Sequence, residues 1–196
     1  MSNGAEMSYK LACETDGFFS AIATVAGTMF GVSWTLCDPN PMPVLEIHGS
    51  NDNVTLWYGD YNDTYWGPYP GTEDVIDFWV EENDCINNED IILESMNTIK
   101  HRYFDCNDNA EVWLYEVVGG GHDWPGYSST EIWNFFSQYS SSLGDINSDD
   151  IINILDVIQA VNLILINEYE QNGDLNQDEV INVLDVIQIV NIILNN

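Results

Sequence analysis

Residues 43–52 read PVLEIHGSND, a short apolar run that ends in a polar loop. The same arrangement returns at residues 111–126, where EVWLYEVV leads into GGGHDWPG. A third apolar run, FFSAIATVA, occupies residues 18–26. Short apolar runs bounded by Gly and Pro are typical of buried strands. We therefore predict three buried strands, two of which lead directly into polar loops.

Helical segments are predicted between and after these strands. Residues 5–14, 72–83 and 131–139 have the composition or the apolar spacing of helices. Strands that alternate with helices are typical of a parallel α/β sheet. The sequence therefore predicts an α/β fold, in which a binding site forms at the carboxyl ends of the strands.

A second domain is predicted after the serine run at 140–142. Beyond that run the chain consists mainly of Ile, Val, Leu, Asn and Asp. Residues 152–165 (INILDVIQAVNLIL) align with residues 181–194 (INVLDVIQIVNIIL), which marks an internal duplication. We place the two domains at residues 1–142 and 143–196, the second being small and all-α.

The charge balance limits the possible partners. The chain has 33 Asp and Glu residues against 3 Lys and Arg, for a formal net charge of −30. Nucleic-acid binding needs basic side chains that displace counterions, and anionic membranes attract the same residues. No apolar run reaches the roughly 20 residues that span a bilayer. We expect neither nucleic acid nor membrane as a partner, but a solvated acidic surface, part of which binds cations.

The four cysteines match neither zinc-ribbon nor Cys-x-x-Cys spacing. Cys85 and Cys106 flank a polar segment, expected to be a loop-rich insertion, and a disulfide between them could staple it. A Cys13–Cys37 disulfide is a second option. Either would indicate an exported, extracellular protein, although no signal peptide is visible.

Ser2, Asp52 and His122 form a candidate catalytic triad. Residues 1–4 (MSNG) supply the last four positions of the Gly-x-Ser-x-Gly elbow, in which a strained strand-to-helix turn exposes a nucleophilic serine. Asp52 and His122 each follow a predicted strand, and the chain order Ser, Asp, His is the order of α/β-hydrolases. In such a triad the histidine takes the serine proton and the aspartate orients the imidazole.

Each member of this triad has an alternative. Ser2 could be an ordinary N-cap of the following helix. Asp60 and Asp63 are rival acids. His48 and His101 are rival bases, although His48 is expected to pack or bond locally and His101 to lie in the insertion.

Four separated segments carry a resemblance to a known family. They are MSNGAEMSYKLACE (1–14), ATVAGTM (23–29), PMPVLEIHGSND (41–52) and VVGGGHDWPG (117–126). Together they resemble the polyhydroxybutyrate depolymerase and feruloyl esterase group of secreted α/β-hydrolases, over residues 1 to about 139. The resemblance implies hydrolysis of carboxylic esters through an acyl-enzyme, on plant cell-wall feruloyl or acetyl esters or on a polyester.

The resemblance also implies roles for single residues. The triad serine would be the nucleophile, and the backbone N–H of Asn3 would be one oxyanion donor. Trp124 would form part of the wall of the acyl pocket. The resemblance further supports the Cys85–Cys106 pairing, and no cofactor is needed for this chemistry.

The sequence departs from the family at its start. The first Gly of the elbow, the strand before it and all earlier strands are absent. We therefore expect an N-terminally truncated sheet with an incomplete oxyanion hole, a loss that typically costs about 10²–10³ in rate for each missing donor. The alternative function is a catalytically inactive chain that acts only as a calcium-dependent interaction module.

Two loops, at residues 145–156 and 174–185, are candidate Ca²⁺ sites. Oxygen ligands recur at loop positions 1, 3, 5, 9 and 12, with a carbonyl at position 7. The ligands of the first loop are Asp145, Asn147, Asp149, the Ile151 carbonyl, Asn153 and Asp156; those of the second are Asp174, Asn176, Asp178, the Val180 carbonyl, Asn182 and Asp185. Hard oxygen donors favour Ca²⁺ over a transition metal.

With Asp at position 12 and one helix after each loop, residues 144–196 resemble a dockerin type I domain. The resemblance implies a Ca²⁺-dependent helix pair that binds a cohesin-type partner. Position 6 is Asp150 and Glu179 instead of Gly, so a strained turn is expected there. The helices are apolar on most sides, which a small domain cannot bury alone. We therefore expect one face against the twin helix and another against a partner, a second copy or the first domain.

Overall fold

The computed structural model describes residues 1–15, 18–139, 143–149 and 151–195. The chain divides into two compact units, Met1–Tyr139 and Ser140–Asn196. No helix in the described ranges is long and apolar enough to cross a membrane.

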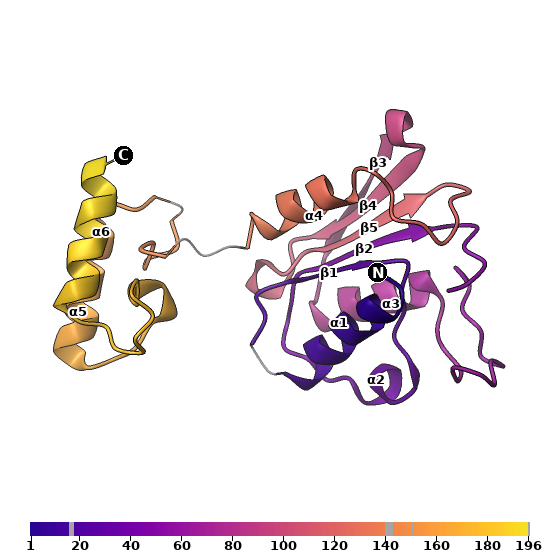
Figure 1. Cartoon of the computed structure of the whole chain (residues 1–196), viewed down its shortest axis with the longest axis horizontal. Helices are drawn as coiled ribbons and strands as arrows, with labels where there is room; N and C mark the ends of the chain where they lie inside the picture. Colours follow the sequence, from indigo (N-terminus) through magenta and orange to yellow (C-terminus); the bar gives the residue numbers. More distant parts are fainter. Residues whose placement is uncertain (16–17, 140–142, 150, 196) are drawn as a thin grey trace. The chain divides into compact units, whose positions relative to one another are not determined.

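The first unit is built on one five-stranded sheet (Figure 1). In spatial order its strands are β1 (Ile22–Val25), β2 (Val44–Gly49), β5 (Val112–Val117), β4 (Thr98–Phe104) and β3 (Asn87–Leu93). The first three strands run parallel, whereas β4 and β3 are antiparallel to their neighbours. The sheet is therefore mixed.

Helices cover both faces of this sheet. They are α1 (Asn3–Glu14), α2 (Gly31–Leu36), α3 (Thr72–Glu82) and α4 (Ser128–Phe136). In Figure 1, α1 and α3 lie on one side of the sheet and α4 on the other. Strands buried on both faces read as continuous apolar runs, which is why β2 and β5 were recognisable in the sequence.

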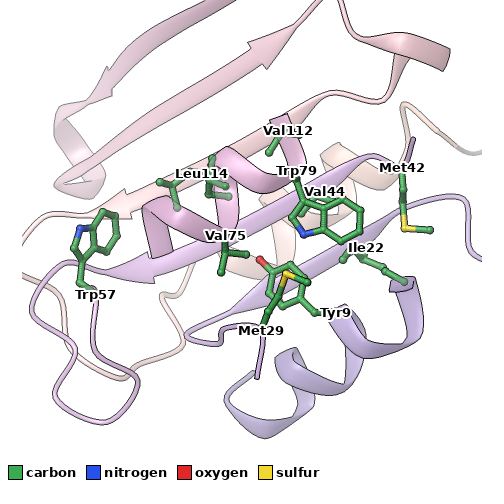
Figure 2. Close-up of a cluster of buried hydrophobic side chains, with 12 residues drawn as sticks. Tyr9, Ile22, Met29, Met42, Val44, Trp57, Val75, Trp79, Val112 and Leu114 are labelled. Carbon is green, nitrogen blue, oxygen red and sulfur yellow. The ribbon is translucent and has the colours of Figure 1, made fainter. Parts of the chain in front are cut away.

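The core has two layers that follow the alternation of side chains along β2 and β5. On one face Val44 and Val112 pack with Tyr9 of α1 and Trp79 of α3 (Figure 2). On the other face their sequence neighbours, Leu45 and Trp113 among them, pack against Phe135 of α4. Successive strand residues point to opposite faces, so one short run serves both layers.

The predicted parallel sheet is confirmed for β1, β2 and β5, but the prediction of a loop-rich insertion at residues 85–106 was wrong. Those residues contain the hairpin of β3 and β4, which extends the sheet beyond β5. The side chains of β3 are almost all exposed, so its composition resembles that of a loop. Pairing with β5 is reinforced across strands, since Arg102 bonds to Glu111 at 2.6 Å and Lys100 stacks over Trp113.

The Cys85–Cys106 disulfide is present as predicted, and the Cys13–Cys37 disulfide, which the sequence left open, is present as well. Cys85 bonds to Cys106 at the base of the hairpin, and Cys13 bonds to Cys37 between α1 and the end of α2. No free cysteine remains among the described residues. Two disulfides are compatible with an oxidising, extracellular location.

The second unit contains α5 (Ile154–Ile166), a short 3₁₀ helix (Gln171–Gly173) and α6 (Val183–Asn195). Ala160 and Ile189 meet at the centre of the helix pair and are fully buried. Asn153 caps α5, since its Oδ1 accepts the backbone N–H of Leu155 at 2.8 Å. The twin helices thus pack against each other through an apolar face.

Asn83, at the end of α3, joins three segments of the first unit by hydrogen bonds: α3, the chain before β2 and the chain before β5. Its Nδ2 donates to the carbonyls of Met42 (2.8 Å) and Ala110 (2.7 Å), and its Oδ1 accepts the backbone N–H of Met42 (3.0 Å). Met42 precedes β2 and Ala110 precedes β5, so one buried amide sets the start of both central strands.

We predict that Asn83→Ala lowers the free energy of unfolding of the first unit by about 3 kcal/mol, because three buried backbone groups lose their partner. Asn88→Ala, at an exposed position of β3, should change it by less than about 0.5 kcal/mol. Urea unfolding followed by tryptophan fluorescence reports on this unit alone, since all 7 tryptophans precede residue 140. Equal stability of the two variants would contradict the prediction.

Candidate active site

Ser2 lies on a strained turn immediately before α1. Its backbone has φ 53° and ψ −130°, a conformation that a residue with a Cβ rarely adopts. The Ser2 N–H donates to the carbonyl of Val25, at the end of β1, at 2.9 Å. Ser2 occupies the N-cap position of α1, but its side chain makes no capping hydrogen bond to the helix. Strained backbone of this kind clusters at functional sites.

Gly27 allows this turn to approach β1. A Cβ on Gly27 would lie 2.2 Å from the Cβ of Ala5 and 3.4 Å from the carbonyl oxygen of Ser2. Any larger residue would push the start of α1 away from the sheet. The position of Ser2 therefore depends on residue 27 being glycine, which has no side chain.

Asp52 and His122 are hydrogen-bonded to each other. His122 Nδ1 lies 2.8 Å from Asp52 Oδ2, although the residues are 70 positions apart. The other carboxylate oxygen, Oδ1, accepts the backbone N–H groups of Val54 (2.7 Å) and Thr55 (3.0 Å). The acid is thus fixed by its own loop and presents one oxygen to the imidazole.

The electrostatic environment keeps Asp52 ionised. Burial opposes the charged form, but hydrogen bonds from His48, from the Val54 N–H and from His122 outweigh it and lower the pKa of Asp52 to about 2. A carboxylate that is ionised at neutral pH can stabilise an imidazolium at His122. His122 itself is only partly buried, so its second ring nitrogen is the one available to a substrate or nucleophile.

A close approach of two loops makes the Asp52–His122 contact. A Cβ on Gly49 would lie 2.4 Å from the carbonyl oxygens of both Gly120 and Gly121. The Asn51 N–H donates to the Gly120 carbonyl at 2.9 Å, and the Gly119 N–H donates to Ser50 Oγ at 2.9 Å. The loops after β2 and β5 are therefore packed backbone to backbone.

We predict that Gly49→Ala destabilises the first unit by about 1–3 kcal/mol, because the added methyl group overlaps two backbone carbonyls. The matched control is Gly126→Ala, at a position where an added Cβ meets nothing within 4 Å. The measurement is again urea unfolding followed by tryptophan fluorescence. If both variants unfolded at the same urea concentration, the close approach would not hold the loops.

The rival acids are engaged in local turns. Asp60 forms an isolated bridge with Tyr69. Asp63 Oδ1 accepts the backbone N–H groups of Tyr65, Trp66 and Gly67. Among the described residues, neither carboxylate is hydrogen-bonded or ion-paired to a histidine.

The rival histidines, His48 and His101, also have hydrogen-bond partners within the protein. His48 is buried in β2 and bonds to Glu46 and to the Thr55 carbonyl, in line with the expectation that it bonds locally. His101 lies on β4 and not in a loop, with its Nδ1 2.8 Å from Asp90. The network around His48 was missed by sequence reasoning, although the Glu-x-His pattern of alternate strand residues could have indicated it.

The three triad candidates are only partly joined. Among the described residues, no hydrogen bond links Ser2 Oγ to His122. Asn3 begins α1, next to Ser2, and lines a surface hollow with Met7 and Phe30. Trp124 is half-exposed in the loop that carries His122. The geometry therefore shows an oriented acid–histidine pair and a strained serine, each at the end of a parallel strand.

The two candidate calcium loops are built alike. Asp156 and Asp185 are fully buried and accept backbone N–H groups of their own loops, Ile146 to Asp156 at 2.8 Å and Leu175 to Asp185 at 3.0 Å. Asp145 and Asp174 are 3% exposed. These four acids are those at loop positions 1 and 12.

The remaining ligand candidates lie at the loop surface and bond to one another. Asn147 Nδ2 donates to Asp149 and Asn176 Nδ2 to Asp178, each at 2.9 Å. The carbonyls of Ile151 and Val180 accept the side-chain amides of Asn153 and Asn182. Within the described ranges, no three His, Cys, Asp or Glu side chains gather in an arrangement that could hold a metal ion.

Position 6 of the second loop has the expected strain, since Glu179 has φ 65°. Its counterpart Asp150 lies outside the described residues. A positive φ at a residue other than Gly costs conformational energy.

Comparison with known proteins gives a limited result. No family model matches the chain. The chain is similar to feruloyl esterase B of Piromyces equi, with 26% identity over 149 residues. The match covers 71% of the chain and 26% of the relative, so the chain spans about a quarter of that protein's length.

Proposed function

We propose that the first unit is a serine carboxylic ester hydrolase in which Ser2 is the nucleophile, His122 the general base and Asp52 the orienting acid. The observation that carries the proposal is the 2.8 Å bond between Asp52 Oδ2 and His122 Nδ1, made by residues on two adjacent strand ends. The strained backbone of Ser2 and the similarity to a feruloyl esterase support it.

The proposed reaction follows from these positions. Because His122 Nδ1 bonds to Asp52, Nε2 is the atom that accepts the Ser2 hydroxyl proton as Ser2 Oγ attacks the ester carbonyl. The backbone N–H of Asn3 stabilises the oxyanion, and His122 then protonates the departing alcohol. Water attacks the resulting acyl-enzyme in the second half of the reaction and releases the acid.

The proposed substrates are plant cell-wall feruloyl or acetyl esters, or a polyester. Trp124 is 47% exposed two residues after His122, where its indole can contact an acyl group. The two disulfides are in keeping with secretion. An extracellular polymer is a substrate of the kind such a protein meets.

We expect Ser2→Ala to lower kcat for p-nitrophenyl acetate and methyl ferulate by about 10³-fold or more, because the nucleophile is lost. Ser8→Ala, on the same helix six residues further on, should keep the wild-type rate. Its hydroxyl bonds only to the Gly4 carbonyl. Equal rates for the Ser2→Ala and wild-type chains would exclude Ser2 catalysis.

We further infer that residues 143–196 form a dockerin-like, Ca²⁺-dependent attachment module. Asp156 and Asp185 are buried in a unit that has no Lys or Arg, since Arg102 is the last residue of either type in the chain. Burying a carboxylate without an opposite charge is costly, and backbone N–H groups compensate only in part. Bound Ca²⁺ would supply the missing positive charge to each loop.

Calorimetric titration of the chain with Ca²⁺ should find two sites. Asp178→Ala removes one oxygen ligand at an exposed position and should abolish or weaken one of them. Glu168→Ala makes the same charge change at an exposed residue outside both loops, so both sites should remain. Absence of binding to the unaltered chain would refute the calcium proposal.

The proposed partner of this module is a cohesin-type domain or a second copy. Ile154 and Leu155 of α5 and Val183 and Leu184 of α6 are 54–63% exposed and occupy corresponding places in the two repeats. Exposed apolar residues that gather at helix starts are typical of interaction surfaces. An inactive chain that serves only this interaction is the second candidate function, favoured by the missing Ser2–His122 hydrogen bond.

A further inference from the structure

A buried polar cluster lies beneath the proposed active site. Glu46 and His48 of β2 are each 1% exposed and point to the same face of the strand. Glu46 Oε2 accepts the hydroxyl of Tyr9 on α1 at 3.1 Å and also that of Thr24 on β1. Glu46 Oε1 accepts the backbone N–H of Gly27 at 3.2 Å. One carboxylate thus joins three elements near the Ser2 turn.

The hydrogen-bond partners of His48 fix the protons on its ring. Nε2 lies 2.9 Å from the carbonyl oxygen of Thr55, which can only accept, so Nε2 carries a proton. Nδ1 lies 2.9 Å from Glu46 Oε1. Both oxygens of Glu46 already act as acceptors, toward the hydroxyls of Tyr9 and Thr24 and the N–H of Gly27, so in the bond to His48 it is Nδ1 that carries the proton.

The same imidazole reaches the proposed catalytic acid. His48 Nε2 is 3.5 Å from Asp52 Oδ2, the oxygen that also accepts His122 Nδ1. The edge of the ring packs against Trp57, with centroids 5.9 Å apart. The ionisable groups that face His48 directly are therefore Glu46 on its own strand and Asp52 on the next loop.

Further ionisable groups lie one step away, among them the buried Tyr69, whose pKa is raised by burial and by nearby carboxylates that include Asp52. Two others bond directly to Glu46 or Asp52. They are Tyr9 of α1, bonded to Glu46, and His122 of the loop after β5, bonded to Asp52. Burial and the nearby Glu46 raise the pKa of Tyr9, so its hydroxyl stays neutral and donates. These contacts form a continuous row from Tyr9 through Glu46, His48 and Asp52 to His122.

We propose that His48 is a permanently charged positioning residue, which holds Asp52 Oδ2 together with His122 and has Glu46 as its buried counter-charge. This inference deepens the proposed function and rests on it for the role of Asp52. The positive charge of His48 partly offsets the negative charge of Asp52. Asp52 therefore stabilises the imidazolium of His122 less strongly than it would without His48. His48 also ties the acid to the cluster that supports the Ser2 turn.

The protonation state is tested directly by NMR of the chain with ¹⁵N-labelled histidine. Only 3 histidines are present, and His101→Gln and His122→Gln assign the signals. Burial lowers the pKa of His48, but bonds to Asp52 and Glu46 outweigh it and raise it to about 10. Both ring nitrogens of His48 should therefore stay protonated from about pH 5 to about pH 9, across the ordinary histidine range. A neutral ring at pH 7, or ordinary titration, would overturn the proposal.

The role of the charge is tested by the pH profile of kcat/KM for p-nitrophenyl acetate. His48→Gln removes the cation beside Asp52, so the acid limb should move to higher pH by about 1 unit. His101→Gln removes a histidine that also contacts two carboxylates, but on β4, and should leave the profile in place. An acid limb unchanged in His48→Gln would reduce His48 to a structural role and overturn the proposal.

The two experiments separate this inference from the proposed function. If the unaltered chain has no esterase activity, the proposed function fails, yet the NMR spectrum still decides the charge of His48. If the chain is active and His48 is neutral, the proposed function stands and the inference fails.

Discussion

The close approach of Gly49 to the carbonyls of Gly120 and Gly121 is the contact on which the rest of the site depends. Parallel strands place their carboxyl ends at one edge of a sheet, but ordinary side chains would keep the two loops apart. With no Cβ at residue 49, backbone meets backbone, and the loops exchange hydrogen bonds directly. Asp52 then reaches His122 across 70 positions of sequence. Gly27 likewise has no Cβ, which allows the Ser2 turn to approach β1.

The core beneath this edge combines apolar packing with a few buried polar groups. Both faces of β2 are covered by helices, so a charged residue in that strand needs partners within the protein. Glu46 finds them on α1, on β1 and in His48. These bonds fix the position of α1 on the sheet. A shift of the helix would deprive the buried Glu46 carboxylate of the Tyr9 donor. The stability of the fold and the geometry of the proposed site thus rest on the same cluster.

Sequence patterns located the segments buried on both faces. The runs at 43–48 and 111–118 became β2 and β5, and the helix expected at 72–83 became α3, since continuous apolar runs and helical spacing are local signals. The β3–β4 hairpin was missed, because an edge strand with exposed side chains has the composition of a loop. The hairpin is held by the backbone hydrogen bonds between β4 and β5. Such pairing between separate strands leaves no signal in a short stretch of sequence.

The sequence by itself determined the acidic surface, the α/β class, the duplicated loops and the two strands that end in Asp- and His-bearing loops. Only the tertiary structure decided which histidine faces which carboxylate. His122 bonds to Asp52 at 2.8 Å, whereas the shorter carboxylate contact of His48 is to Glu46 at 2.9 Å and its contact with Asp52 is 3.5 Å long. The physical reason is that such pairing depends on strand order and on how closely two backbones approach. Residue type and spacing do not encode the distance between the two backbones, because that distance depends on all the groups packed around them.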